Sequence, residues 1–265
     1  MEKARQKAQS SRRRLLEGID RGGYAEAITI ADSEPELLEN PDDALLRAEL
    51  ALYRDEFAEA EAALDRLGGA DLWIDEEGEA GNRARRTRLL RVEVACFSGE
   101  LDEAERLVRP MVDAAVRGRD AQSEIRAIYD MARITRHRAQ WNLTIDRLER
   151  ALDLAREAGN TFYEGRIAYT LGYCWYSLNR FDLAVPFLES SLDLLTSTEN
   201  LRFRATVEIF YGCLLSDRGE PEAALEMLAR AESTVGNLGV MSDMVMARMN
   251  VARTLLVLGQ YEEVE

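Results

Sequence analysis

A unit of about 40 residues recurs along this chain, and it limits the possible fold more than any other sequence feature. The unit is clearest at residues 161–198, where two apolar-periodic segments flank a short break at Asn179 and Arg180. Apolar residues at spacings of three, four and seven mark one face of a helix, and Asn tolerates the left-handed conformation that ends a helix. We therefore predict that the unit is a helix hairpin.

Small and large residues occupy fixed places in this unit. Two helices approach closely only where a side chain is nearly absent, and a large residue then fills the neighbouring gap. The small position of the first helix is Ala132, Gly172, Gly212 and Ala252, and a leucine of the second helix recurs as Leu148, Leu188 and Leu228. The predicted turn positions are Gly22, Asp55, Gly99, Ala139, Asn179, Gly219 and Gly259.

This pattern, a Gly or Ala followed about twelve residues later by Ala and then by Leu and Ala, resembles tetratricopeptide repeats. The period is 33 between the first two units, 44 at the next step and 40 thereafter, whereas the common form has about 34 residues. Long repeats of this kind are similar to those of the maltose-activator type of bacterial regulator. The resemblance implies an all-α, TPR-like α-solenoid, a right-handed superhelix of antiparallel helix hairpins with six repeats and a truncated seventh.

We predict one array over residues 1–265. Its repeats are expected at about 3–35, 42–67, 83–117, 121–157, 161–196 and 200–235, with a partial repeat at 241–265. A Gly-rich insertion at 68–82 is expected to be a loop, with Trp73 and Ile74 docked on the solenoid; an exposed Trp73 that contacts a partner is the alternative. Pro110 is expected to bend the second helix of the third repeat.

The net charge of −15 disfavours direct binding of nucleic acid, because the phosphate backbone would be repelled. No apolar run is long enough to span a membrane, and no secretory signal is recognisable. The three cysteines, Cys96, Cys174 and Cys213, show no metal-ligand spacing and are predicted to be buried thiols. These features favour a cytoplasmic protein without nucleic-acid or membrane partners.

Catalytic motifs are not recognisable. His137 is the single histidine, and phosphate-binding, dinucleotide-binding and zinc-protease motifs do not occur. We therefore expect no catalytic residues, no metal site and no cofactor, and we expect that this chain is not an enzyme.

One polar feature is periodic: Arg86, Arg126 and Arg166 lie 40 residues apart, near the start of three successive first helices. The family resemblance implies that first helices line a concave groove. The predicted ligand-binding residues are Arg86, Arg126, Tyr129, Arg133, Arg166, Tyr169, Tyr173 and Tyr176. Arginine can form paired hydrogen bonds with a carboxylate, and tyrosine adds contact area. An acidic peptide or protein segment would therefore suit this groove. Alternatively, each arginine pairs with a nearby acid, such as Glu124 or Glu164, or with the next repeat.

The end of the sequence remains apolar at Leu255–Leu258, and Tyr261 stands where a second helix would begin. We therefore expect the chain to be part of a longer protein. The leading hypothesis is a protein- or peptide-binding TPR module, the regulatory or sensory part of a larger bacterial-type signalling or transcription regulator. The alternative is a self-assembling adaptor that forms a homo-oligomer through its uncapped C-terminal end.

Overall fold

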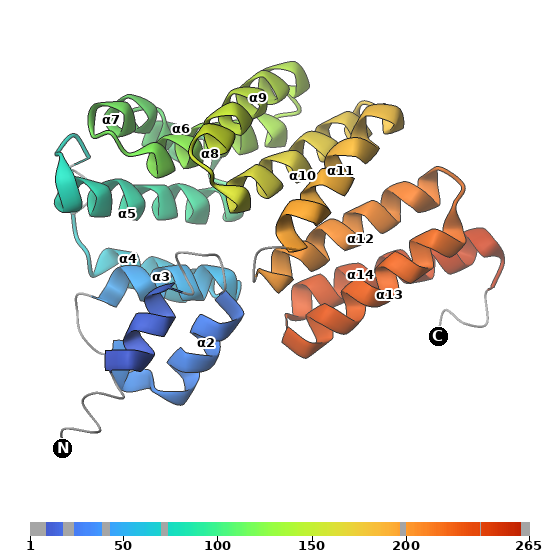
Figure 1. Cartoon of the computed structure of the whole chain (residues 1–265), viewed down its shortest axis with the longest axis horizontal. Coiled ribbons are helices and arrows are strands. Elements are labelled where there is room, and N and C mark those ends of the chain that lie inside the picture. The colour runs from blue at the N-terminus through green and yellow to red at the C-terminus, as the bar shows by residue number, and fades with distance from the viewer. Residues whose placement is uncertain are drawn as a thin grey trace. The chain divides into compact units, whose positions relative to one another are not determined.

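The computed structural model describes residues 9–17, 24–38, 43–69, 74–196, 200–238 and 240–260, and every regular element in these ranges is a helix (Figure 1). The chain forms two compact units. The first contains residues 26–163 together with the helical residues 9–17, and the second contains residues 164–260. None of the described helices is long and apolar enough to cross a membrane.

The first unit consists of short helices that pack on their sequence neighbours. Its elements are α2 (Tyr24–Ser33), η1 (Pro35–Leu38), α3 (Ala44–Tyr53), α4 (Phe57–Asp65), α5 (Gly78–Phe97), α6 (Leu101–Val108), α7 (Met111–Arg117), α8 (Ala121–His137) and α9 (Trp141–Glu157). Helix α3 packs on α4, α5 on α6 and α8 on α9, as expected of successive hairpins. One core cluster lies between α5, α6 and α7 and includes Val92, Val108 and Met111.

The second unit contains most of α10 (Thr161–Ser177), followed by α11 (Phe181–Thr196), α12 (Leu201–Asp217), α13 (Pro221–Leu238) and α14 (Met241–Leu258). Its hairpins close around the predicted small residues. A Cβ added at Gly172 would lie 2.8 Å from Cδ2 of Leu188, and one at Gly212 would lie 2.7 Å from Cγ of Leu228. The alternation of small and large residues is therefore a real packing feature of these hairpins.

The turns between the paired helices also follow the prediction. Each predicted turn position in the described ranges has a positive φ: Asp55 at 63°, Gly99 at 78°, Ala139 at 55°, Asn179 at 58°, Gly219 at 83° and Gly259 at 74°. In these turns the following N–H reaches back to the last turn of the helix, as Arg180 N does to Trp175 O at 2.9 Å. This bond satisfies a carbonyl at the helix end and stabilises the left-handed residue. Gly22 lies outside the described residues.

The predicted loop at 68–82 is too long. Helix α5 begins at Gly78, so residues 78–82 are helical and the third repeat begins before residue 83. The reason is a buried anchor that the sequence did not reveal: the Arg85 side chain is fully buried and donates to Ile74 O at 2.8 Å and Glu76 O at 2.9 Å. These bonds hold the incoming chain against the first turns of α5. Ile74 joins the core cluster of the first unit, as the docked-loop interpretation expected, and Trp73 lies outside the described residues.

Pro110 has a stronger effect than the predicted bend. Helix α6 ends at Val108 and α7 begins at Met111, with Pro110 as the residue before its first turn. Proline has no N–H to donate to the helix and its ring clashes with the carbonyl four residues earlier, so the second helix of this repeat is divided into two. From residue 121 to 258 the described helices follow one another as α8 to α14. The first predicted repeat, at about 3–35, is described only over residues 9–17 and 24–35, and residues 261–265 lie outside the described ranges.

Candidate functional site

The arginines predicted to line a groove in the first unit make ion pairs within that unit. On α5, Arg86 forms two parallel bonds to Glu49 of α3, Nε to Oε1 and Nη2 to Oε2, both at 2.6 Å. Glu49 is almost completely buried, whereas the Arg86 side chain is 36% exposed. A bidentate arginine–carboxylate pair of this kind is strong and fixes the relative orientation of the two side chains. Arg86 therefore links the first helices of two successive repeats.

Arg126 and Arg133 on α8 belong to a second, more buried network. Arg126 Nη2 donates to Glu93 Oε2 of α5 at 2.7 Å, and Arg133 Nη1 donates to Asp130 Oδ1 at 3.2 Å and lies 3.7 Å from Glu93 Oε1. The Arg133 guanidinium also stands over the Phe97 ring, 5.4 Å from its centroid. Two cations and two carboxylates thus neutralise one another between α5 and α8.

The electrostatics of this network keep both arginines charged. Burial by itself would lower the pKa of Arg126, but its electrostatic interactions with Tyr163 and with the carboxylates of Glu93 and Asp130 outweigh burial and raise that pKa. Burial would also lower the pKa of Arg133, but the charges of Asp130 and Glu93 outweigh burial and raise that pKa. The guanidinium groups of Arg126 and Arg133 therefore remain charged inside the folded unit.

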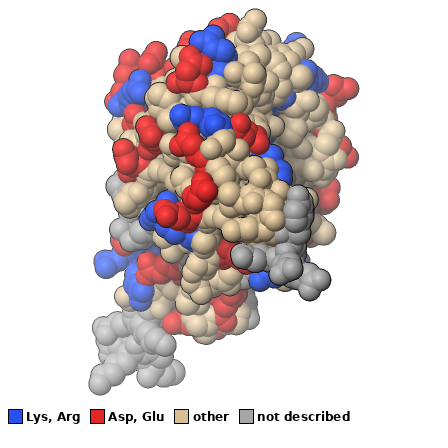
Figure 2. Space-filling view, turned by 90° about the vertical axis from the view of Figure 1, so that its right-hand side faces the viewer, with Lys and Arg blue, Asp and Glu red and all other residues tan. Residues whose placement is uncertain are grey.

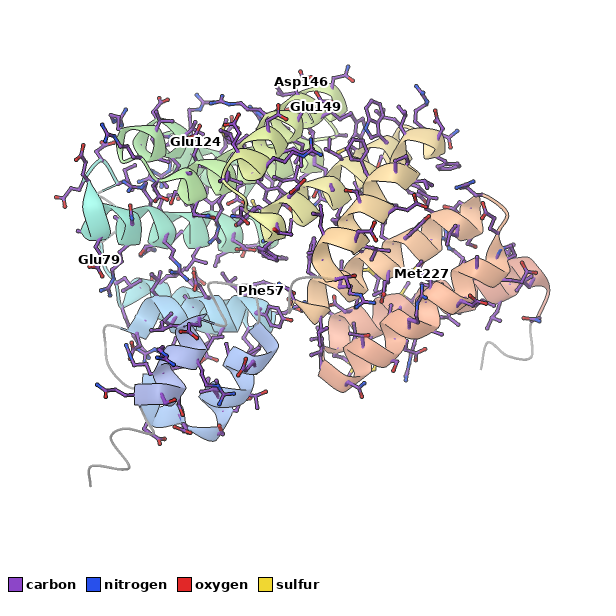
Figure 3. The ribbon with its side chains drawn as sticks, in the orientation of Figure 1. Phe57, Glu79, Glu124, Asp146, Glu149 and Met227 are labelled. Atoms are coloured by element: carbon purple, nitrogen blue, oxygen red, sulfur yellow. The ribbon has the colours of Figure 1, made fainter. Side chains whose placement is uncertain are left out.

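Tyr129 and Arg133 are buried, so the structure does not place them on an accessible surface of the first unit. Tyr129 instead packs edge-on against Tyr163, with ring centroids 5.9 Å apart. Glu124, which the sequence offered as an arginine partner, lies on α8 (Figure 3), and its Oε1 is 3.5 Å from Nη2 of Arg150. The observed pairs support the alternative interpretation that the arginines hold neighbouring helices together, although their partners lie in the preceding repeat.

In the second unit, the predicted tyrosines do gather at one place. Tyr169, Tyr173 and Tyr176 of α10 surround Phe210 of α12, with ring centroids 5.6, 5.2 and 5.1 Å from it. Tyr169 also meets Phe203 edge-on at 5.5 Å. All these rings are partly exposed. We call these five residues the aromatic cluster.

Polar groups border the aromatic cluster. The Arg166 guanidinium stands over the Phe203 ring, 5.3 Å from its centroid. At the other end, the Tyr176 hydroxyl donates to Asp217, and Arg253 Nη1 lies 3.2 Å from the same carboxylate. Burial and the bond to Asp217 raise the pKa of Tyr176 to about 12, so its hydroxyl remains a donor at neutral pH. The cluster therefore offers flat apolar rings between the Arg166 guanidinium and the Tyr176 hydroxyl, which can both form hydrogen bonds.

The sequence analysis missed Phe203 and Phe210. The two phenylalanines lie seven residues apart and so share one face of the helix. That spacing could have identified them as a pair. Which face of α12 is exposed, however, depends on how α12 packs on α10 and α13.

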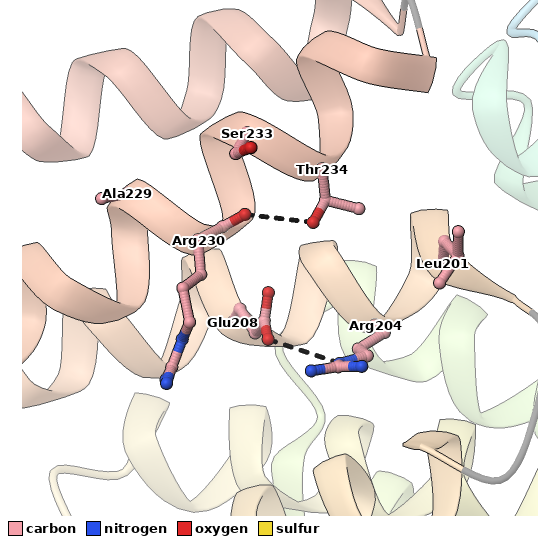
Figure 4. A pocket seen from close by; sticks show the side chains of 7 residues that line it. All are labelled: Leu201, Arg204, Glu208, Ala229, Arg230, Ser233 and Thr234. Atoms are coloured by element: carbon pink, nitrogen blue, oxygen red, sulfur yellow. Dashed lines mark hydrogen bonds and ion pairs between the residues drawn. The ribbon is translucent and has the colours of Figure 1, made fainter.

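A shallow pocket of about 470 Å³ lies elsewhere on the second unit, between α12 and α13 (Figure 4). It is lined by Leu201, Arg204, Glu208, Ala229, Arg230, Ser233 and Thr234. Arg204 Nε lies 3.4 Å from Glu208 Oε1 across its floor. Because Arg204 and Glu208 lie on a different face of α12 from Phe203 and Phe210, this pocket is separate from the aromatic cluster.

The surface outside these sites is charged and mixed. Asp146 and Glu149 are exposed on α9 (Figure 3), and the face in Figure 2 shows acidic and basic side chains interspersed. Interspersed charges are typical of a solvated helix surface. In the described parts of the chain, no group of three or more His, Cys, Asp or Glu residues is placed to hold a metal ion. His137 is exposed, and its pKa is lowered by partial burial and by Arg136 and Arg133.

The sequence matches no protein-family model and no curated protein. Solved structures of similar fold include the following three. BtubC (BKLC) from P. vanneervenii has a TM-score of 0.64 and 17% identity, over 79% of this chain and 85% of that chain. A Rap protein in complex with competence and sporulation factor has a TM-score of 0.60 and 12% identity, over 98% and 94%. A signal transduction ATPase with numerous domains and a tetratricopeptide repeat sensor, from Pyrococcus horikoshii, has a TM-score of 0.61 and 12% identity, over 91% and 36%. The repeated hairpins, their turn geometry and these similarities together identify the chain as a helical repeat protein with the tetratricopeptide-type fold.

Proposed function

We propose that this chain is a protein- or peptide-binding module that takes its ligand on the aromatic cluster of the second unit. The observation that carries this proposal is the group of partly exposed rings, Tyr169, Tyr173 and Tyr176 beside Phe203 and Phe210. Aromatic side chains bury a large area on binding and lose little conformational entropy, which is why they dominate binding hot spots.

The ligand in this proposal is a peptide segment with at least one acidic group. Arg166 borders the cluster and offers a planar donor group to a carboxylate. In the first unit, Arg86 is the more exposed of the two arginines that bridge successive helices, but an acidic ligand there would have to displace Glu49. We place the principal contacts at the aromatic cluster and Arg166, because these side chains are partly exposed. Binding by Arg126, Tyr129 and Arg133 remains a prediction from the sequence.

The wider role that we propose is regulatory. A Rap protein of similar fold is seen in complex with competence and sporulation factor, and a tetratricopeptide array serves as the sensor of the larger ATPase. By analogy of fold, ligand binding to this chain would regulate a larger bacterial-type signalling or transcription protein in the cytoplasm. We expect no catalytic step in this chain.

The test begins with selection of peptides from a random displayed library on the immobilised full chain. Affinities of the selected peptides are then measured for the wild type, Tyr173→Ala and Leu178→Ala. Leu178 is an exposed residue near the same helix that lies outside the aromatic cluster, so it is the matched control. We expect Tyr173→Ala to weaken binding at least tenfold and Leu178→Ala to leave it unchanged. Equal affinities for all three proteins would overturn the proposal, and circular dichroism checks that each variant is folded.

Enrichment of Asp and Glu among the selected peptides tests the acidic ligand separately. An Arg166→Gln variant should reduce binding of acidic peptides and leave neutral ones unaffected. Loss of both classes to the same extent would mean that Arg166 supports the cluster without recognising charge.

A further inference from the structure

Helix α14 carries a strip of apolar residues on its outer face. Val245, Met249 and Leu256 are 49%, 68% and 47% exposed, and Ala252 lies among them and is partly exposed. Steps of four, three and four residues place these side chains on one face of the helix. We call Val245, Met249, Ala252 and Leu256 the α14 strip.

The preceding repeat shows what such a strip normally contacts. Forty residues earlier on α12 stand Ala205, Ile209, Gly212 and Ser216, and all four are buried. Helix α13 covers them: Leu228 seats against Gly212, and Ala231 and Val235 pack with Ala205 and Ile209. The α14 strip is therefore the face that receives the second helix of a hairpin, and no described residue of this chain covers it.

We propose that a second copy of this chain covers the α14 strip, with the two α14 helices antiparallel about a twofold axis. The strip is self-complementary in that arrangement. With the axis between Met249 and Ala252, each Met249 faces the Ala252 of the other copy, and each Val245 faces the other Leu256. In the Met249–Ala252 pairs a large side chain then fills the space above a small one, as Leu188 does above Gly172 inside the hairpin. A twofold pairing of identical surfaces closes on itself and stops at the dimer.

The charges of α14 permit this pairing. Its charged residues are Asp243, Arg248 and Arg253. Asp243 pairs with Arg202 at 2.8 Å, Arg248 with Glu232 at 2.8 Å and Arg253 with Asp217 at 3.2 Å. Each charged side chain of α14 thus forms an ion pair inside its own copy. The dimer therefore does not bring two unpaired like charges together. The strip also differs from the aromatic cluster, so this inference does not depend on the proposed peptide binding.

The test is the molar mass of the full chain in solution, measured by sedimentation over a wide range of concentration. We expect a reversible dimer whose dissociation constant rises at least tenfold in Leu256→Glu and by less than threefold in Val257→Glu. These neighbours are matched: Val257 is 61% exposed but points about 100° away from the strip. Because both side chains are exposed, both variants should fold. A monomer at every concentration, or equal effects of the two variants, would overturn the proposal.

Cross-linking tests the antiparallel geometry. In Val245→Cys/Leu256→Cys the two thiols are about 16 Å apart along one helix, too far to join within a copy. Mild oxidation should therefore give covalent dimers in non-reducing electrophoresis. The matched control, Val245→Cys/Val257→Cys, turns one thiol off the strip and should remain monomeric, as should the wild type with its native Cys213. Equal cross-linking in both double variants contradicts the antiparallel pairing.

Discussion

Arg126 Nη2 lies 2.7 Å from Glu93 Oε2 and so joins the first helices of two successive repeats, α8 and α5. Both side chains are largely buried, and Arg133 and Asp130 complete the network. A periodic arginine can therefore serve as a connector between repeats. Ligand binding is one use of such a residue, and packing of the array is another.

Reversal of this charge should destabilise the first unit. Arg126→Glu would place a third carboxylate beside Glu93 and Asp130 with Arg133 as the single remaining cation. Breaking a buried pair by loss of one partner costs about 3–5 kcal/mol. We expect a loss of this size in the free energy of unfolding, measured with urea.

The control for this variant is Arg106→Glu, which removes an exposed pair to Glu103 within α6. It should cost about 1 kcal/mol or less, because solvent screens surface pairs. An Arg126→Glu variant as stable as this control would show that the network contributes little.

Gly172 tests the packing of the hairpins. Gly172→Val would force a branched side chain against Leu188 and should cost about 1–3 kcal/mol by overpacking. Gly172→Ala should cost less than Gly172→Val but should still destabilise, because its single Cβ already meets Leu188 Cδ2 at 2.8 Å and requires a smaller shift. The control is Gly236→Val on α13, where an added Cβ meets nothing within 4 Å. Equal thermal stability of the two valine variants would refute close packing at Gly172.

Arg85 and Gly118 should depend on each other. A Cβ on Gly118 would lie 2.5 Å from Nη1 of Arg85, so Gly118→Ala must displace a guanidinium that also donates to Asp120 Oδ2 at 3.0 Å. Arg85→Ala should cost about 3–5 kcal/mol through the buried partners that it leaves. In a double-mutant cycle, the double variant should lose less than the sum of the two single losses. Additive losses would mean that the two sites are independent.

Stability should fall at alkaline pH partly because of Cys96. Burial raises the pKa of this thiol from 9.0 to about 11, more than Arg133 lowers it. The folded state therefore holds a proton that the unfolded state has released, and the stability present below pH 9 is lost as pH rises toward 11. Cys96→Ala should show a shallower loss of unfolding free energy between these pH values and a constant offset below them. Parallel curves across this range would contradict the assignment.

The sequence by itself determined the repeat, the hairpin and its turns. Small residues such as Gly172 and Gly212, and turn residues such as Asp55 and Asn179, are restricted by sterics within one hairpin, so their spacing is visible along the chain. The boundaries of α8 to α14 follow from the same local periodicity.

Only the tertiary structure decided what the polar residues contact. The start of α5 depends on Arg85 and the chain that it binds, and the roles of Arg86 and Arg126 depend on Glu49 and Glu93, acids 37 and 33 residues earlier. Tyr173 and Phe210 likewise meet only because α10 and α12 stand side by side. Backbone conformation and helix periodicity depend on near neighbours, whereas ion pairs and ring contacts depend on which helix faces are brought together. That choice is made by the packing of the whole unit.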